Sequence, residues 1–303
     1  MKKNRLGQSD LYVSALGLGC MSLGTDEKTA FPILEAAVEA GVNYFDTADL
    51  YDFGQNEQIL GKYFKQNRED VIIASKAGNR WKENKESWTW DASKAYIKEA
   101  AKQSLKRLNT DYIDLYQLHG GTLDDPIDET IEAFEELKAE GYIRYYGVSS
   151  IRPNVIREYV KRSNIVSVMM QYSILDRRPE EEALPLLQDN GISVVTRGPV
   201  AKGLLSDNFL NKLTAKGYLD YSEEELRSTL ESLKARFEGK RSLLEAAVQY
   251  NLSSPAVVSI IAGASSAEQL KENAKAVNSS ALNQDELQII QAVSKAAFYK
   301  NHR

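Results

Sequence analysis

The chain has 303 residues, and 38 lysines and arginines against 43 aspartates and glutamates give a net charge of −5. This mild acidity and the lack of an apolar run near the roughly 20 residues of a membrane-spanning helix argue against nucleic-acid and membrane partners. One cysteine and two histidines exclude a disulfide framework and a metal centre built on several such ligands. We therefore expect a cytoplasmic protein without a metal; no sequence feature specifies its oligomeric state.

The first residues resemble two known motifs without fulfilling either. Basic residues before the apolar stretch 11–20 are typical of a lipoprotein signal, but polar residues interrupt its start and the apolar run is short. Gly17 and Gly19 begin a dinucleotide-binding pattern, but Ser22 occupies the place of its third glycine. We instead expect residues 7–10 to form the turn of an N-terminal β-hairpin.

Beyond the hairpin, short apolar or β-branched runs alternate with segments of helical periodicity. The runs cover residues 15–19, 43–47, 71–76, 112–118, 143–149, 166–171, 192–197 and 257–263. The clearest helical segments are residues 29–40, 93–108 and 127–139; the second begins at Ser93, a favoured N-cap, and a glycine closely follows each of the other two. Strands that are apolar on both faces and separated by helices indicate a parallel sheet covered by helices.

Eight strand–helix units in about 300 residues match the closed (β/α)₈ barrel, or TIM barrel, and an open doubly wound sheet is the alternative. No linker or low-complexity tract divides the chain, so we expect one α/β domain over residues 1–303. Helical segments 222–237 and 242–250 lie between the seventh and eighth strands, and we expect the first to be an insertion. A last helical segment, residues 283–298, is expected to cap or flank the barrel.

Polar side chains follow three successive strands of this predicted barrel. Asp46 ends the second strand, and Tyr51 follows a few residues later. Lys76 ends the third strand, and His119 follows the fourth. Because barrel enzymes carry their chemistry at the C-terminal ends of the strands, we expect these four side chains to meet on one rim.

This set of groups suits proton donation to an oxygen that gains negative charge. A tyrosine hydroxyl, with a pKa of about 10, is a slow proton donor at neutral pH, and a nearby ammonium lowers that pKa. A carboxylate such as Asp46 keeps Lys76 charged and oriented. A neutral imidazole at His119 can donate a hydrogen bond to a substrate carbonyl oxygen. No nucleophile in this set is paired with a base, which argues against acyl transfer. The set fits better a reaction in which a hydride is added to a carbonyl carbon while the oxygen is protonated.

Four segments resemble the aldo-keto reductase family: residues 44–62 (YFDTADLYD…NEQILGK), 116–119 (YQLH), 141–150 (GYIRYYGVSS) and 263–276 (GASSAEQLKENAKA). The resemblance implies a (β/α)₈ barrel and an oxidoreductase that reduces an aldehyde or ketone to an alcohol by hydride transfer from NADPH. It implies a catalytic set made of the general acid Tyr51, its partner Lys76, the ion-pairing Asp46 and the substrate-orienting His119. Tyr51 and His119 would then also contact the substrate.

Cofactor contacts are expected mainly on the loops after the seventh and eighth strands, where barrels often bind phosphate. Gly198 and Gly203 let backbone amides approach a pyrophosphate, Lys202 adds charge, and a helix that starts at Ser266 favours an anion. By the resemblance, the nicotinamide carboxamide is held by Ser149, Ser150 and Gln171. The expected cofactor-binding residues are Gly19, Met21, Asp46, Ser149, Ser150, Gln171, Arg197, Gly198, Pro199, Val200, Lys202, Gly203, Gly263, Ser265, Gln269 and Asn273.

Three features depart from the commoner family pattern. Ser150 stands where asparagine is usual, and Arg197 stands where many members stack an aromatic ring on the nicotinamide; a guanidinium can also stack. Ser265 and Ser266 replace the basic residue that often binds the 2′-phosphate of NADPH. We therefore expect NADP(H), with NAD(H) as the alternative cofactor.

All three tryptophans of the chain lie in the loop after the third strand. We expect Trp81 and Trp88 to contact the substrate as part of an aromatic wall or lid; the alternative is that the tryptophans bury the underside of the loop. Small aldehydes, dicarbonyls and sugar-derived carbonyls all suit this interpretation. The alternative functions are a cofactor-binding redox sensor or regulator with weak reductase activity, and a lyase or isomerase on the same barrel.

Overall fold

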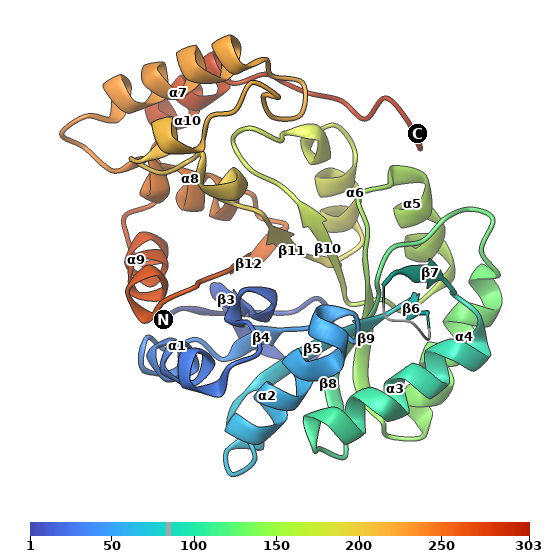
Figure 1. The fold of residues 1–303 in the computed structure, drawn as a ribbon. Coiled ribbons are helices and arrows are strands. Elements are labelled where there is room, and N and C mark those ends of the chain that lie inside the picture. Colours follow the sequence, from blue (N-terminus) through green and yellow to red (C-terminus); the bar gives the residue numbers. More distant parts are fainter. Residues whose placement is uncertain (83–85) are drawn as a thin grey trace.

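An eight-stranded parallel barrel forms the centre of the computed structural model, which describes residues 1–82 and 86–303 (Figure 1). The strands follow one another around the barrel in chain order, and β12 closes it by pairing with β3. They are β3 (Leu16–Gly19), β4 (Tyr44–Asp46), β5 (Ile72–Ala77), β8 (Ile113–Leu118), β9 (Ile143–Ser149), β10 (Ser167–Gln171), β11 (Ser193–Arg197) and β12 (Val257–Ala262). Each strand end lies within one residue of its prediction, so the (β/α)₈ barrel is confirmed; that the whole chain is one domain stays a prediction.

Helices cover the outside of the barrel, one after nearly every strand (Figure 1). These helices are α1 (Glu27–Glu39), α2 (Gln55–Tyr63), α3 (Lys94–Leu108), α4 (Ile127–Ala139), α5 (Pro153–Arg162), α6 (Ala183–Asp189), α8 (Leu243–Leu252) and α9 (Ala267–Val277). Ser93 caps α3 as predicted, because its hydroxyl accepts a hydrogen bond from the backbone N–H of Tyr96 at 3.3 Å.

Two further helices, α7 (Glu223–Phe237) and α10 (Gln284–Val293), pack against each other at the top of Figure 1. They confirm the extra helices expected after the seventh strand and near the C-terminus. The prediction that the last helix runs to residue 298 is wrong, because the backbone turns extended at Ser294. The Arg177 guanidinium donates to both the carbonyl and the hydroxyl oxygen of Ser294 at 3.3 Å, and so binds the chain where it leaves the helix.

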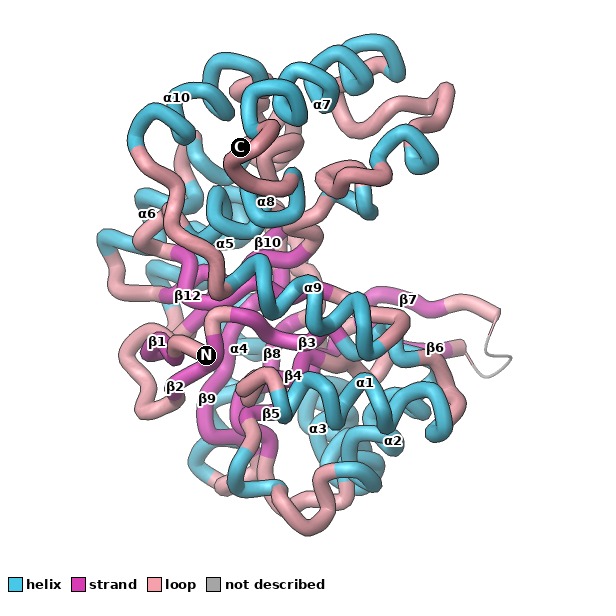
Figure 2. Tube along the Cα trace, turned by 90° about the vertical axis from the view of Figure 1, so that its left-hand side faces the viewer, coloured by secondary structure: helices cyan, strands magenta, loops and turns pink. Residues whose placement is uncertain are grey.

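Two antiparallel hairpins lie at opposite ends of the barrel (Figure 2). The N-terminal hairpin, β1 (Lys3–Arg5) and β2 (Tyr12–Ser14), was expected from the turn residues and is confirmed. The other hairpin, β6 (Asn79–Trp81) and β7 (Trp88–Trp90), lies in the loop after β5 and was not predicted. Among the described residues, no helix is both long and apolar enough to cross a membrane.

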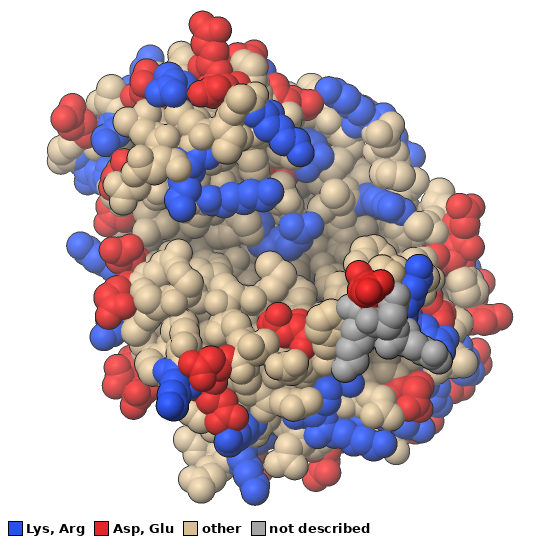
Figure 3. Space-filling model, in the orientation of Figure 1, with Lys and Arg blue, Asp and Glu red and all other residues tan. Residues whose placement is uncertain are grey.

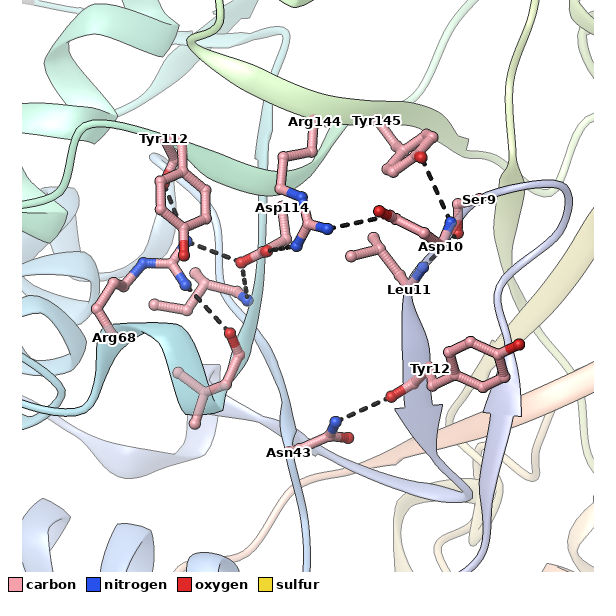
Figure 4. A network of polar contacts seen from close by, with 12 residues as sticks. Ser9, Asp10, Leu11, Tyr12, Asn43, Arg68, Tyr112, Asp114, Arg144 and Tyr145 are labelled. Atoms are coloured by element: carbon pink, nitrogen blue, oxygen red, sulfur yellow. Dashed lines mark hydrogen bonds and ion pairs between the residues drawn. The ribbon is translucent and has the colours of Figure 1, made fainter.

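Charged side chains tie the N-terminal hairpin to the barrel (Figure 4). The buried carboxylate of Asp114 on β8 accepts hydrogen bonds from Arg68 and Arg144, each at 2.8 Å, and from the backbone N–H of Ile73 at 3.0 Å. Arg144 also donates to Asp10 in the hairpin turn at 3.0 Å. Residues far apart in the sequence thereby fix the end of the barrel that lies away from the β6–β7 hairpin.

Side chains along several barrel strands, among them β4, β10 and β11, change from apolar to polar toward the C-terminal end. Tyr44, Ala74 and Leu115 belong to the apolar cluster inside the barrel. Because side chains two residues apart share a face of a strand, Asp46 and Lys76 point to the same interior one step higher. The alternation of the strands therefore brings polar groups to the C-terminal rim.

Candidate active site

Asp46 and Lys76, at the ends of the adjacent strands β4 and β5, form a buried ion pair. The Lys76 ammonium lies 2.7 Å from the Asp46 carboxylate and donates to the Thr47 carbonyl oxygen at 2.7 Å. The same ammonium is 3.3 Å from the Tyr51 hydroxyl. Burial alone would lower the pKa of the Lys76 ammonium, but the adjacent Asp46 carboxylate, helped by Tyr51, raises it above its ordinary value. The lysine is therefore held in its charged form beside the tyrosine hydroxyl.

An unusual backbone turn delivers Tyr51 to this position. Tyr51 opens the one-turn 3₁₀ segment η2 (Tyr51–Gly54), in which Asp52 and Phe53 have φ of 46° and 58°. Such left-handed conformations cost roughly 1–3 kcal/mol each in residues other than glycine. Gly54 completes the turn with φ of 77°, and a Cβ there would lie 2.5 Å from the Arg107 side chain. Tyr51 is therefore held at the start of a turn with strained backbone.

The His119 imidazole completes the group of four. Its ring meets that of Tyr51 edge-on, with centroids 5.9 Å apart. Burial lowers the pKa of His119 to about 3, with smaller contributions from the positive charges of Lys76 and Arg197. The imidazole is therefore neutral at pH 7 and able to donate one hydrogen bond to an oxygen in the site. The structure thus brings together the four side chains that the sequence placed on one rim.

A buried polar layer beneath these residues was missed by the sequence analysis. Glu57 on α2 accepts hydrogen bonds from Ser75 at 2.5 Å and from Arg107 at 2.6 Å. Asp49, between Asp46 and Tyr51, accepts one from the Tyr96 hydroxyl at 3.2 Å. Burial, reinforced by the charge of Glu57, raises the pKa of Asp49 to about 7. The signal available in the sequence was the segment 44–62, which contains both carboxylates.

Gln171 and Arg197, at the ends of β10 and β11, lie side by side on the rim. Arg197 donates to the Gln171 side-chain oxygen at 3.1 Å, and its charge reaches His119 and Asp46. Ser149 is half-buried at the end of β9, and the adjacent Ser150 is buried, with its hydroxyl accepting from the Arg152 N–H at 3.2 Å. Gln171 and Arg197 therefore lie together on the rim with the Arg197 charge near His119, and Ser149 and Ser150 lie at the end of the neighbouring strand β9.

Gly19 and Gly263, two of the expected cofactor-binding residues, lie where the neighbouring strands β3 and β12 end. Gly19 and Gly263 flank Ser22, whose hydroxyl bonds the carbonyl oxygens of Gly19 and Ala264, each at 3.0 Å. A Cβ at Gly263 would come within 3.0 Å of that hydroxyl, so glycine at this position leaves room for the Ser22 side chain. The helix α9 starts just beyond, and helix N-termini favour anions. These residues fit a dinucleotide pyrophosphate.

The remaining expected cofactor residues lie just after β3, just after β12 and in the loop after β11. Gln269 on α9 accepts hydrogen bonds from the Ser265 N–H and hydroxyl, at 2.8 Å and 3.1 Å, and Asn273 donates to Gly263 at 3.3 Å. Met21 is 66% exposed. The loop after β11 contains Gly198, Pro199, Val200, Lys202 and Gly203. Figure 3, which views this face, shows a central hollow with lysine and arginine side chains along its upper margin, suited to an anionic ligand.

The three tryptophans belong to the β6–β7 hairpin and have different surroundings. Trp81 packs on Phe53, with ring centroids 4.2 Å apart, and so lies close to the loop of Tyr51. Trp88 is 53% exposed and lies opposite Trp81 in the hairpin. Trp90 is half-buried and donates to Asp125 at 2.7 Å. Substrate contact by Trp81 and Trp88 stays a prediction, whereas Trp90 packs under the loop.

Comparison with known proteins identifies the family to which the chain belongs. The family model described as "Aldo/keto reductase family" matches residues 15–295. An uncharacterized oxidoreductase, YqkF of Bacillus subtilis (strain 168), is 58% identical over 307 residues that span 100% of both chains. An NADH-specific methylglyoxal reductase of Escherichia coli (strain K12) is 32% identical over 92% of this chain and 94% of its own.

A solved structure resembles the whole molecule. The aldo-keto reductase AKR11C1 from Bacillus halodurans, in its holo form, is 61% identical with a TM-score of 0.95, over 100% of this chain and 99% of its own. The family match covers the barrel and all four rim residues, Asp46, Tyr51, Lys76 and His119. The chain is therefore a member of the aldo/keto reductase family of oxidoreductases.

Proposed function

We propose that this oxidoreductase reduces an aldehyde or ketone to an alcohol with NADPH, and that Tyr51 donates the proton to the carbonyl oxygen. The observation that carries the proposal is the Lys76 ammonium, 2.7 Å from the Asp46 carboxylate and 3.3 Å from the Tyr51 hydroxyl. A nicotinamide cofactor, when bound, supplies a hydride to the carbonyl carbon. The protein supplies the proton, the orientation of the substrate and a partly water-excluded site.

Each of the four rim residues has a part in this proposal. The Tyr51 hydroxyl releases its proton to the oxygen that gains charge, and Lys76 stabilises the phenolate that forms. Asp46 keeps the lysine charged and directs it at the hydroxyl. His119, neutral because it is buried, donates a hydrogen bond that orients the substrate oxygen.

The cofactor residues fit NADPH and leave NADH as the alternative. Gly198, Gly203 and Lys202 with the N-terminus of α9 would hold the pyrophosphate, and Ser149, Ser150, Gln171 and Arg197 would hold the nicotinamide. The basic margin of the hollow favours a 2′-phosphate, whereas Ser265, whose hydroxyl donates to Gln269, adds no positive charge there. One relative is named as NADH-specific, and equal or tighter binding of NADH by this chain would overturn the preference.

The substrate side of the site is partly aromatic. Phe53, in the turn that carries Tyr51, is 47% exposed and packs against the ring of Trp81. Small aldehydes, dicarbonyls and sugar-derived carbonyls remain the candidate substrates. One relative is named as a methylglyoxal reductase, so an α-dicarbonyl belongs in the first assay.

The test is oxidation of NADPH and NADH in the presence of a panel of these carbonyls, for the wild type and Tyr51→Phe. We expect the variant to lose turnover by at least about 100-fold while its Kd for NADPH stays unchanged. Tyr12→Phe, an exposed tyrosine in the N-terminal hairpin, is the matched control and should behave as wild type. Full turnover in Tyr51→Phe would exclude the proposed proton donor, and slow turnover with every carbonyl would favour the sensor alternative.

A further inference from the structure

The side-chain amide of Gln171 is held on both of its ends. Its nitrogen donates to the Asp176 carboxylate at 2.8 Å and to the Tyr218 hydroxyl at 3.3 Å. Its oxygen accepts from Arg197 at 3.1 Å. The two donors of the amide nitrogen are thus used within the protein, whereas its oxygen keeps a second lone pair.

Asp176 determines which way round this amide lies. A carboxylate only accepts hydrogen bonds, so the group that faces it must be the amide nitrogen of Gln171. Arg197, which only donates, selects the oxygen on the other side. The two charged partners therefore enforce the same orientation, and a reversed amide would face both with the wrong group.

Asp176 is itself fixed in place. It is fully buried, and a tight turn brings it back against β10 through reciprocal backbone hydrogen bonds with Ser173 at 3.2 Å and 2.9 Å. Arg178 binds its two carboxylate oxygens with two nitrogens, each at 2.7 Å. A bidentate guanidinium supplies both the charge that compensates burial and a defined geometry.

The C-terminal tail supports this pair from outside. The Arg178 guanidinium lies over the ring of Tyr299, 4.8 Å from its centroid, and Tyr299 is only 7% exposed. Figure 1 shows the tail leaving α10 and ending beside α5, where the His302 carbonyl accepts from the Asn154 N–H at 3.0 Å. Lys300 forms an exposed ion pair with Asp220 at 2.8 Å. Contacts thus run from Tyr299 through Arg178 and Asp176 to Gln171.

We propose that Asp176, held by Arg178 and Tyr299, is a positioning residue that locks the Gln171 amide with its oxygen toward the cofactor, so that the site selects the NH₂ group of the nicotinamide carboxamide. The proposal rests on the proposed function, since it assumes that a nicotinamide binds at this rim. It assigns a role in cofactor recognition to the last residues of the chain. None of these three residues was singled out by the sequence patterns.

The test compares two cofactors that differ only at the carboxamide: NADP⁺ and its 3-acetylpyridine analogue, in which a methyl group replaces the NH₂. Wild-type protein should bind NADP⁺ more tightly, because only NADP⁺ can donate to the Gln171 oxygen. Asp176→Asn removes one of the two charged partners that fix the amide and leaves only Arg197, so reversed amides become populated and we expect the ratio of the two Kd values to fall about 5- to 10-fold toward one. The ratio is the readout because both cofactors carry the same charges, so a change in net charge at residue 176 cancels.

Tail variants separate positioning from general folding. Tyr299→Leu removes the ring under Arg178 and should lower the ratio of the two Kd values. Tyr299→Phe keeps the ring and should leave this ratio close to its wild-type value. Lys300→Ala breaks only an exposed ion pair of the same tail and should leave the ratio at its wild-type value. If Asp176→Asn fails to fold, Tyr299→Leu still tests the positioning role.

The outcomes distinguish the two proposals. An unchanged Kd ratio in both Asp176→Asn and Tyr299→Leu, with wild-type protein that binds NADP⁺, would overturn the positioning role alone. Wild-type protein that binds neither NADP(H) nor NAD(H) would contradict the proposed function, and the positioning role with it.

Discussion

The ammonium of Lys76 lies 2.7 Å from the carboxylate of Asp46, and both side chains are almost closed to solvent, with 1% and 5% exposed. Burying two charges costs free energy that their attraction only partly returns. A buried pair of this kind therefore contributes little to the free energy of unfolding, but it keeps a positive charge beside the Tyr51 hydroxyl.

The first prediction concerns this pair. Lys76→Met leaves the Asp46 carboxylate buried without a partner, and we expect a loss of about 3–5 kcal/mol in the free energy of unfolding. Turnover should fall by roughly 10²–10⁴-fold, because the Tyr51 hydroxyl loses its ammonium. Urea unfolding and steady-state kinetics measure the two effects.

Two further variants make this first prediction specific. Adding Asp46→Leu to Lys76→Met should recover stability without recovering turnover, since no charge is then buried alone. Lys62→Met breaks an exposed ion pair with Glu27 and should cost less than about 1 kcal/mol with no loss of turnover. Wild-type turnover in Lys76→Met would contradict the assigned role of the lysine.

The second prediction concerns the turn that carries Tyr51. Gly54→Ala must accept φ of 77° and a Cβ 2.5 Å from Arg107, so we expect a lower free energy of unfolding and reduced turnover. Gly239→Ala is the matched control, since its φ is 72° and nothing lies within 4 Å of the added Cβ. The left-handed backbone conformation should lower the free energy of unfolding of both variants by about 1–2 kcal/mol. Gly54→Ala should lose more than this, because its Cβ also meets Arg107. Equal losses in urea unfolding would show that the space beside Arg107 does not matter.

The third prediction is the pH dependence of stability due to Asp49. Its pKa rises from an ordinary 3.8 to about 7 in the fold, mainly through burial and next through the charge of Glu57, while Arg107 and Tyr96 oppose the rise. Between these two pH values the folded protein therefore keeps a proton that the unfolded chain releases. The resulting contribution of Asp49 to the free energy of unfolding is full below about pH 4 and is lost as the pH rises through 7. We expect the free energy of unfolding to fall by up to about 4 kcal/mol from this group over that interval.

Asp49→Asn tests this pH dependence because asparagine does not titrate. The difference in free energy of unfolding between the variant and the wild type should change between pH 4 and pH 8, with the variant gaining relative stability as the pH rises. A difference that is constant over this range would contradict the raised pKa of Asp49.

The fourth prediction concerns His119. With a pKa of about 3, set first by burial and then by the charges of Lys76 and Arg197, the imidazole stays neutral throughout the working range. We therefore expect the pH profile of kcat/KM to show no step from a histidine between pH 5 and pH 8. His302→Gln removes the only other histidine, which is exposed near the C-terminus, and identifies any step that it causes. A step near pH 6.5 that disappears in His119→Gln would contradict the neutral imidazole.

The local pattern of apolar and polar residues was enough to predict the barrel and to place the four rim residues. Each strand is a short apolar run, and Asp46, Lys76 and His119 are polar residues at the points where such runs end. The hairpin β6–β7 was missed because its strands consist of polar and aromatic residues without an apolar run. The end of α10 was misplaced because the Arg177 side chain, distant in sequence, binds the chain at Ser294.

The sequence by itself determined the (β/α)₈ barrel, the family resemblance and the residues at the strand ends, because these depend on periodicity and on spacing along one strand. Tertiary structure alone decided the charge states and orientations. The neutral His119, the raised pKa of Asp49 and the direction of the Gln171 amide depend on burial and on partners that lie far away in the chain. Packing of distant segments sets these interactions, and no local pattern of residues contains them.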